Sequence, residues 1–481
     1  MKLYRLIPVL SLFVIVSCTA GRVSIAPAPE GEPLSAKWKV YAAGREVPVF
    51  DAKVASGDKE MRRLACDDVS NSGNYYDIAS FASFDLVKGK AKVEVVVPEE
   101  VREAKVLPES AGIVPEIKGN KISFNVSRPL NLTIDVNGDF IHSLHVFVNP
   151  PETDVPDPDD PDVIYYAPGI HDLYEAVVVG DNKTVYLAPG AILRWHNWQE
   201  GDGHDPKLCS GSCFILSGNN VKFRGRGIID QDDVHRTRSR GPMRITGTNV
   251  SLEGVIIRNS SGWTVVLSDA ENVDIDNIKL IGFRANSDGI DICDSHHVRV
   301  HDSFIRTLDD LIVVKAISSK SDRGCSDILA ERCVLWNEIA HALSIGAEIR
   351  YPVKGVAFRD CDVIHDTCRE WSLRIFHTDS ALISDVSFEN IRIEEAERFI
   401  SLWINSAVWT SDAERGHIMN VVFKDIVLKT PPRMGTEVQF LGYDEGHAIE
   451  GVLLDNVSIG GRKITAEDIE MNPFVSGVTV R

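Results

Sequence analysis

The chain has 481 residues, which is too many for one ordinary compact domain, although a repeat solenoid could take up most of them. A hydrophobic content of 44% allows a large core, while aromatic residues make up only 7%. The formal net charge of −19 argues against nucleic acid or an anionic membrane surface as a partner. It also disfavours a polyanionic substrate, unless a local basic cleft captures one.

The first residues resemble an export signal. The apolar run at 6–16 is too short to span a bilayer as a stable helix, and it leads into a lipobox-like sequence that ends at Cys18. Cys18 would then be the lipidated first residue of the mature chain, and a plain secretory signal is the alternative. We expect a lipoprotein signal peptide at 1–18, a flexible tether at 19–36, and a protein exported to the bacterial cell envelope, in the outer membrane or periplasm. Membrane contact is expected only through the lipid anchor.

Eight further cysteines could pair in an exported protein. Cys209 and Cys213 are spaced to close a small loop, whereas Cys293, Cys333 and Cys361 fall inside apolar repeat strands, where buried thiols are expected. Because no second closely spaced Cys or His pair accompanies Cys209 and Cys213, we expect no zinc site, and the sequence indicates no other metal or cofactor.

Two regions follow the tether. Short alternating strands between turn signals predict a β-sandwich at 37–148. Residues 149–162 are rich in Pro and Asp, which form neither helix nor ladder, so a stiff linker is expected.

From 163 to 481 the sequence repeats. An aliphatic residue, usually preceded by Asn, Asp, His or Gly, recurs at intervals of 23 to 35 residues, at positions 221, 250, 273, 298, 328, 356, 386, 421 and 452. Helical periodicity is absent, so helical repeats fit poorly. The pattern favours an all-β fold, a right-handed parallel β-helix that follows the small β-sandwich.

Three carboxylates are spaced by about one repeat: Asp288, and then Asp309 with Asp310. Coils stack about 5 Å apart, so these side chains are expected to lie together, with His341 and Arg374 on the next two coils. Carboxyl groups that share a site have separated pKa values, which acid/base cleavage of a glycosidic bond requires. Solvated turn residues are the alternative for each of these side chains taken alone.

Four ordered motifs resemble glycoside hydrolase family 28, the polygalacturonase family: Asn286-Ser287-Asp288, Asp309-Asp310, the segment 341–346 and Arg374-Ile375. The resemblance implies a right-handed parallel β-helix and hydrolysis with inversion. It implies Asp309 as the general acid, with Asp288 and Asp310 positioning and deprotonating water. His341 would support the acid, and Arg374 and Asn286 would contact the sugar.

The sequence departs from the family pattern at several positions. Ser287 replaces a Thr, and Ala340 and Ala342 replace glycines. Phe376 stands where the family has the Lys that binds a uronate carboxylate. This indicates either a neutral sugar or a carboxylate bound elsewhere, for which a cluster of arginines at 236–244 is a candidate.

A weaker resemblance, in domain layout, is to glycoside hydrolase family 49, the dextranases. Aromatic side chains that could stack on sugar rings are Trp195 and Trp198 early in the solenoid and Trp371, Trp403 and Trp409 later, while Trp263 is expected in the core. His377, beside Phe376, is a further candidate for substrate binding.

The sequence therefore predicts an exported glycoside hydrolase of a polysaccharide or oligosaccharide, with a pectin-type, galacturonate-containing glycan as the expected substrate. The alternatives are a dextranase-like hydrolase of a neutral α-glucan, a β-helix polysaccharide lyase with Arg374 as base and Ca²⁺ on the carboxylates, and a solenoid that only binds carbohydrate. The linkage, endo or exo action, disulfide pairing and oligomeric state stay open.

Overall fold

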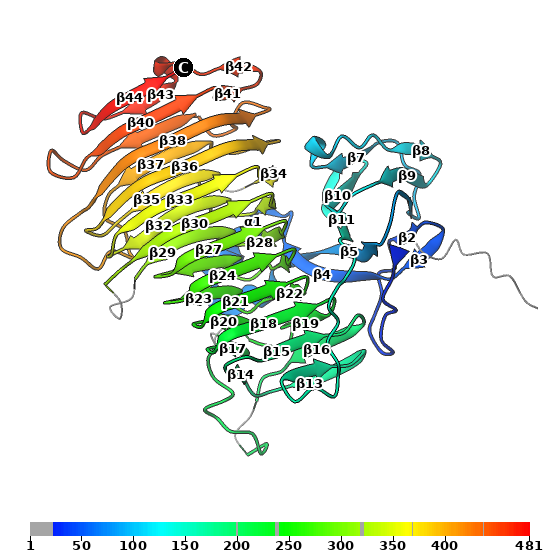
Figure 1. Ribbon diagram of the computed structural model, residues 1–481. Coiled ribbons are helices and arrows are strands. Elements are labelled where there is room, and N and C mark those ends of the chain that lie inside the picture. The colour runs from blue at the N-terminus through cyan, green and yellow to red at the C-terminus, as the bar shows by residue number, and fades with distance from the viewer. Residues whose placement is uncertain (1–22, 199–200, 236–239, 318–321, 368, 436) are drawn as a thin grey trace, which may run out of the picture.

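The computed structural model describes residues 23–198, 201–235, 240–317, 322–367, 369–435 and 437–481. Two packed sheets come first, and the chain then winds into a long solenoid (Figure 1). The six-stranded sheet contains β1 (Val23–Ser24), β4 (Val49–Ala55), β5 (Tyr76–Leu86), β7 (Ala104–Leu107), β10 (Leu130–Val136) and β11 (Asp139–Asn149). The five-stranded sheet contains β2 (Lys39–Ala42), β3 (Arg45–Val47), β6 (Ala91–Val96), β8 (Glu116–Lys118) and β9 (Lys121–Val126).

The solenoid has two walls of almost entirely parallel strands. An 11-stranded sheet contains β14 (Val177–Val179), β17 (Phe214–Leu216), β20 (Met243–Ile245), β23 (Val265–Ser268), β26 (Ile290–Cys293), β29 (Ile312–Ala316), β32 (Leu343–Ile349), β35 (Leu373–His377), β37 (Ile400–Ile404), β39 (Val438–Leu441) and β43 (Ile469–Met471).

The 22-stranded sheet supplies the rest of each coil. It contains β12 (Val163–Tyr166), β13 (Gly169–Leu173), β15 (Thr184–Leu187), β16 (Ala191–Trp195), β18 (Asn219–Gly225), β19 (Ile228–Asp230), β21 (Thr248–Glu253), β22 (Ile256–Arg258), β24 (Glu271–Asp276), β25 (Lys279–Ile281), β27 (His296–His301), β28 (Phe304–Thr307), β30 (Cys325–Glu331), β31 (Val334–Asn337), β33 (Val353–Arg359), β34 (Asp362–Asp366), β36 (Leu382–Ile393), β38 (His417–Leu428), β40 (Ile449–Asp455), β41 (Ser458–Ile459), β42 (Arg462–Lys463) and β44 (Val475–Val480).

The repeated aliphatic residues stack in register through the core. Val221 pairs with Val250, Val250 with Val273 and Val273 with Val298 across neighbouring strands, and all four are buried. The preceding residues, such as Asn249 with φ 55°, adopt the left-handed conformation that Asn tolerates better than most residues. The side chain of Asn249 also donates to the amide oxygen one coil below at 3.1 Å. This repeat therefore produces both the turn and the stacking, and the predicted parallel β-helix is confirmed.

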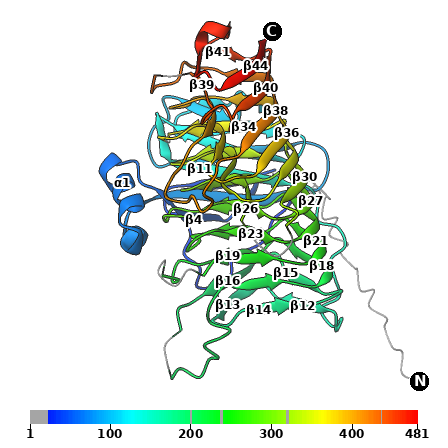
Figure 2. The ribbon, with the colours of Figure 1, turned by 90° about the vertical axis from the view of Figure 1, so that its left-hand side faces the viewer.

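The helices are short. Between β4 and β5 lie α1 (Lys59–Asp67) and the 3-10 segment η1 (Val69–Asn74), which project beside the solenoid (Figure 2). Asp58 caps α1 by accepting from two backbone N–H groups. Ala65 packs on Leu308, so α1 borders the loop that carries Asp309. Two further 3-10 segments are η2 (Glu109–Ala111) and η4 (Ala466–Asp468), and no helix among the described residues is long and apolar enough to cross a membrane.

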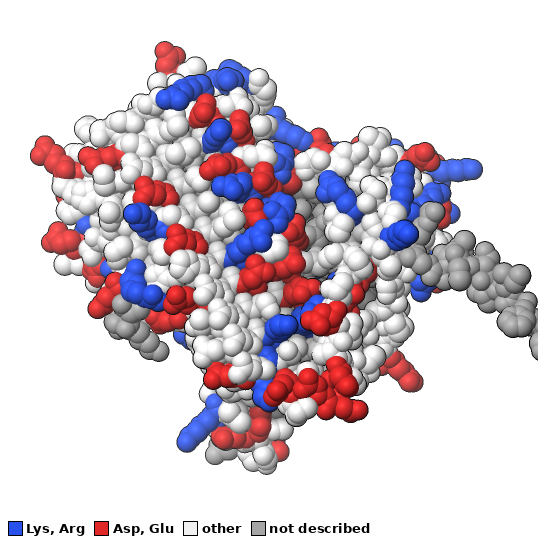
Figure 3. Space-filling model, viewed as in Figure 1, with Lys and Arg blue, Asp and Glu red and all other residues white. Residues whose placement is uncertain are grey.

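The described part of the predicted tether, 23–36, is tied to both domains, so a flexible tether is wrong there. β1 pairs with β5, and the buried Glu32 carboxylate forms ion pairs with Arg194 and Arg258 of the solenoid. The predicted signal peptide and Cys18 lie outside the described residues. In the face shown in Figure 3, Lys and Arg lie among Asp and Glu, so the net charge of −19 does not make this face uniformly acidic.

The sandwich packs on the outer side of the 22-stranded sheet. Phe81 and Phe147 from the sandwich meet Phe304 and Trp336 from the solenoid in one apolar cluster. Within this interface Arg306 is fully buried, pairs with the fully buried Glu338 at 3.0 Å, and also donates to a backbone oxygen and to side chains of β11. Arg306 therefore links the two domains by hydrogen bonds, and its counter-charge Glu338 lies beside it in the solenoid.

Glu338→Gln is expected to lower the free energy of unfolding by about 3 kcal/mol, because it leaves the Arg306 charge buried without a counter-charge. Thermal unfolding monitored by circular dichroism measures the change. Glu389→Gln is the matched control, since Glu389 and its partner Arg359 are partly exposed and such pairs contribute about 0–1 kcal/mol. Equal losses for the two variants would contradict the prediction.

Candidate active site

The three predicted carboxylates meet on two loops that lead into strands of the 11-stranded sheet. Asp288 precedes β26, and Asp309 and Asp310 precede β29. Ile290 pairs with Ile312, so the coil repeat here is 22 residues and Asp288 is in register with Asp310. The N–H of Gly289 donates to the backbone oxygen of Asp310 at 2.8 Å, which fixes this alignment. The sequence spacing predicts that Asp309 aligns with Asp288. In the structure Asp310 aligns with Asp288, and Asp309 is the residue before it.

One oxygen from each of Asp288, Asp309 and Asp310 lies within 4.8 Å of the others. Burial, together with the charges of Asp291 and Asp309, raises the pKa of Asp288 well above its usual value. Burial and the neighbouring Asp310 raise the pKa of Asp309. Asn286, with φ 54°, places its Nδ2 3.4 Å from Asp309 Oδ2. Asp288 and Asp309 therefore hold their protons to a higher pH than isolated aspartates do.

Asp310 is the exception among the three. Burial acts to raise the pKa of Asp310, but the hydrogen bond from His341, together with the charges of Lys315 and Arg374, holds it below the usual value. His341 Nδ1 lies 2.6 Å from Asp310 Oδ1, and Arg374 Nη1 lies 3.1 Å from His341 Nε2. A guanidinium can only donate, so Nε2 accepts and Nδ1 carries the proton that His341 donates to Asp310. Asp310 is thereby kept as a carboxylate.

Lys315 and Asp291 are site residues that the sequence analysis missed. Lys315 Nζ lies 3.0 Å from Asp291 Oδ1 and 3.4 Å from Asp288 Oδ2, and all three side chains are buried. Burial raises the pKa of Asp291 to about 7, although the charge and hydrogen bond of Lys315 act to lower it. Trp263, expected in the core, instead places its ring 3.9 Å below the Lys315 ammonium. Strand alternation could have found Lys315, because Ile312 and Val314 are core residues and Lys315 must point outward.

Arg374 and Phe376 both point outward from β35, whereas Leu373 and Ile375 enter the core. Arg374 pairs with Glu370 at 2.5 Å, and its guanidinium carbon lies 4.5 Å from the centre of the Phe376 ring. Phe376, at the position where the family has a Lys, therefore belongs to an aromatic cluster beside the hydrogen bonds that join Arg374, His341 and Asp310.

Three other predicted substrate-binding residues do not reach these carboxylates. His377 points inward, is fully buried and bonds the backbone oxygen of Ala381 at 2.6 Å. Trp195 is fully buried and packs edge-on against Phe214, as strand parity with the core residue Leu193 requires. Trp198 is half-buried on the loop between β16 and β17, whereas Asp288 lies between β25 and β26.

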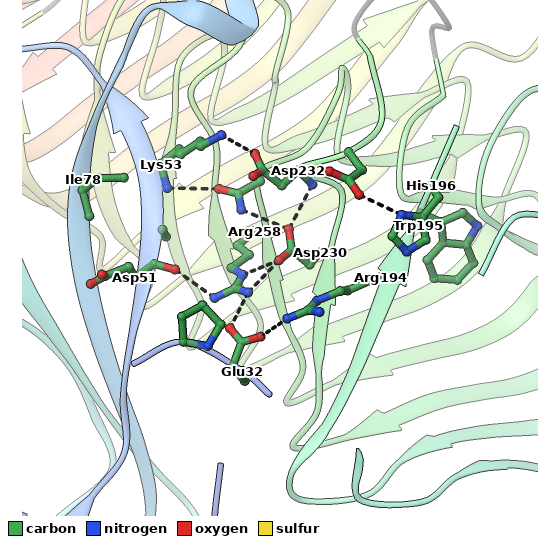
Figure 4. Close-up of a pocket in the computed structure, with 14 residues that line it drawn as sticks. Glu32, Asp51, Lys53, Ile78, Arg194, Trp195, His196, Asp230, Asp232 and Arg258 are labelled. Atoms are coloured by element: carbon green, nitrogen blue, oxygen red, sulfur yellow. Dashed lines mark hydrogen bonds and ion pairs between the residues drawn. The ribbon is translucent and has the colours of Figure 1, made fainter. Parts of the chain in front are cut away.

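Trp195 borders an interdomain cavity. It has a volume of about 350 Å³ and is lined by charged side chains, and Trp195 lies at its margin (Figure 4). Figure 4 shows Glu32 between Arg194 and Arg258, with Asp230 completing the ion pairs. These charged groups form ion pairs between the segment before the sandwich and the solenoid. The cavity is therefore part of the interface between domains and lies apart from the carboxylates.

Two groups among the described residues have a geometry that could hold a metal ion: Asp288 with Asp309 and Asp310, and Asp276 with His301 and Asp302. In the first group Asp288 already faces Lys315 and Asp310 already faces His341. The seven described cysteines, Cys209 and Cys213 included, are thiols, and Cys293, Cys333 and Cys361 are buried as predicted.

Comparison with known proteins places this site in context. The family model of glycosyl hydrolases family 28 matches residues 240–475. An exopolygalacturonase of Arabidopsis thaliana is 28% identical over 185 residues, which are 37% of this chain and 41% of the relative. Exopolygalacturonase B of Aspergillus niger is 24% identical over 297 residues, 56% of this chain and 64% of the relative. The matches thus span less than two thirds of these curated relatives.

Two solved structures share the fold over 95% of this chain. Dex49A from Penicillium minioluteum has a TM-score of 0.62 and 15% identity, with 95% of this chain and 96% of that chain covered. The family 28 exopolygalacturonase of Yersinia enterocolitica has a TM-score of 0.51 and 12% identity, with 95% and 93% covered. The resemblance to glycoside hydrolase family 28 that the motifs predict is therefore confirmed over residues 240–475. This match indicates that the protein is a glycoside hydrolase.

Proposed function

We propose that this protein hydrolyses glycosidic bonds of a pectin-type, galacturonate-containing glycan, and that it does so with inversion. The observation that carries the proposal is geometric: Asp288, Asp309 and Asp310 each place an oxygen within 4.8 Å of the others, and His341, which Arg374 contacts, bonds Asp310. In line with this geometry, the pKa of Asp309 is raised and that of Asp310 is lowered. One protonated and one ionised carboxyl group in the same site are what acid-catalysed glycoside cleavage needs. The relatives named exopolygalacturonases support the galacturonate-containing substrate.

In the proposed reaction, Asp309 donates its proton to the glycosidic oxygen as the bond from that oxygen to the anomeric carbon breaks. A water molecule held by Asp288 and Asp310 attacks the anomeric carbon and gives a proton to Asp310. The leaving sugar then carries the proton from Asp309, and the anomeric carbon carries the hydroxyl of the water. The proton on Asp310 returns to Asp309 through solvent, which restores both groups. Ionised carboxylates also stabilise the positive charge that develops on the sugar.

The stereochemical outcome needs a direct test, because inverting pairs are usually about 6.5–9.5 Å apart and retaining pairs about 5 Å. Here carboxylate oxygens approach within 4.8 Å, and inversion rests on the family resemblance and on two carboxylates sharing the water. The lyase alternative is disfavoured because its base, Arg374, already donates to His341 and Glu370.

The purified protein is expected to release reducing ends from a panel of pectins, polygalacturonate, rhamnogalacturonan and dextran, with a pectin-type member as the best substrate. Proton NMR of the first product is expected to show the anomer opposite to that of the cleaved bond. A retained anomer would contradict the mechanism, and products that absorb in the near ultraviolet would identify a lyase. Cleavage of dextran alone would favour the dextranase-like alternative.

Export and anchoring through Cys18 are also part of the proposal. They rest on the sequence of residues 6–18 alone.

A further inference from the structure

Three aromatic side chains pack together on the side of β35 that carries Arg374: Phe376 is buried, Trp403 is half-buried and Trp409 is exposed. Phe376 on β35 pairs with Trp403 on β37, and their rings stack with centroids 4.8 Å apart and planes at 17°. Trp409, on the loop after β37, meets Phe376 edge-on with centroids 6.2 Å apart. Trp409 is 54% exposed, which is unusual for so large an apolar side chain. Phe376, Trp403 and Trp409 are called the aromatic platform below.

The aromatic platform is connected to the carboxylates through Arg374 and His341. The guanidinium carbon of Arg374 lies 4.5 Å from the Phe376 ring centre and 5.4 Å from that of Trp403. The same guanidinium donates to His341, which bonds Asp310. A sugar residue adjacent to the scissile bond on this side would then contact the platform through Trp409 and the exposed part of Trp403.

The two cations that contact the carboxylates or the platform already have carboxylate partners, and the guanidinium carbon of the nearby Arg398 lies 5.4 Å from the Trp371 ring centre. Lys315 is already ion-paired with Asp291 and Asp288, and Arg374 with Glu370. A substrate carboxylate would have to compete with these protein carboxylates for either cation. Aromatic faces also carry partial negative charge, which repels an anion and favours the C–H bonds of a sugar ring.

We propose that the sugar bound over the aromatic platform, next to the scissile bond, is uncharged: a methyl-esterified uronate or a neutral hexose, not a free uronate. This inference rests on the proposed function, since it names the sugar on one side of the bond that the proposed reaction cleaves. The platform then selects the sugar by stacking against its ring, whereas a lysine at position 376 would select a uronate by ion pairing.

The test measures binding apart from cleavage. The full chain carrying Asp309→Asn is titrated, by calorimetry, with oligogalacturonides of one length in methyl-esterified and free-acid form, and with isomalto-oligosaccharides. We expect at least one neutral ligand to bind about tenfold more tightly than the free acid. Adding Trp409→Ala should weaken binding of that ligand about tenfold and change the free acid less.

Two more variants complete the design. Phe376→Lys restores a cation and should shift preference toward the free acid by about tenfold, while Trp198→Ala, on a distant loop, should change neither affinity. Preference for the free acid, equal affinities, or absence of binding by every neutral ligand would each overturn the inference.

Cleavage assays on the wild-type protein keep the two proposals apart. If neutral oligosaccharides bind through Trp409 but the wild type cleaves nothing in the panel, the proposed hydrolysis is wrong and the platform assignment stands. If the wild type cleaves only free-acid polygalacturonate, hydrolysis stands and the platform assignment is wrong.

Discussion

Asp309→Asn is expected to lower the rate of sugar release by about 10³-fold, the size of effect that a general acid contributes. Asparagine has nearly the shape of aspartate, so the hydrogen bond with Asn286 and the packing of the loop beside α1 can persist. What the variant lacks is a proton that can be transferred to the leaving oxygen. The reducing-end assay on the best substrate of the panel measures the loss.

Two controls separate loss of the acid from loss of the fold. Asp327→Asn changes an exposed aspartate of β30 and should leave the rate unchanged. A substrate with a fluoride leaving group needs little protonation, so Asp309→Asn should lose far less activity on it than on the glycan. An equal loss on both substrates would mean that Asp309 has a structural role.

Local sequence rules were sufficient to predict the solenoid. The valines at 221, 250, 273 and 298 stack because each coil buries the same position, and the preceding Asn or His residues take the turn conformation there. A repeat of this kind is readable from sequence because each coil contacts only its neighbours. Contacts between domains are not of this kind: neither the pairing of Glu32 with Arg258 nor the packing of α1 on Leu308 has any local sequence signal.

The site was predicted in part. Asp288, Asp309, Asp310, His341 and Arg374 come together because they occupy equivalent loops and strand starts. His377 was misplaced because a strand turns successive side chains to opposite faces, so the residue after the outward Phe376 must enter the core. The same parity rule places Lys315 outward, in contact with Asp288.

Lys315→Met is expected to move the acidic limb of the kcat/KM profile to higher pH by about one unit, which is a tenfold loss on that limb. Burial raises the pKa of Asp288 most, and the negative charges of Asp291 and Asp309 raise it further. The positive charge of Lys315 opposes this rise. Without Lys315 the pKa of Asp288 rises further, so Asp288 stays protonated at pH values where the wild type has begun to ionise. A protonated Asp288 neither stabilises a developing positive charge nor orients water as a carboxylate does.

The pair of Lys315 with Asp291 allows a sharper test, because removing both partners removes a cation and the acid beside it. In Lys315→Met/Asp291→Asn the opposing charge of Lys315 is lost, but so is the charge of Asp291 that raises the pKa of Asp288. The acidic limb of the double variant should therefore return toward the wild-type position, and Lys315→Arg, which keeps the charge, should shift it little. If Lys315 only supports packing over Trp263, the variants would lose activity equally at every pH, and the double variant would be no closer to the wild type than Lys315→Met.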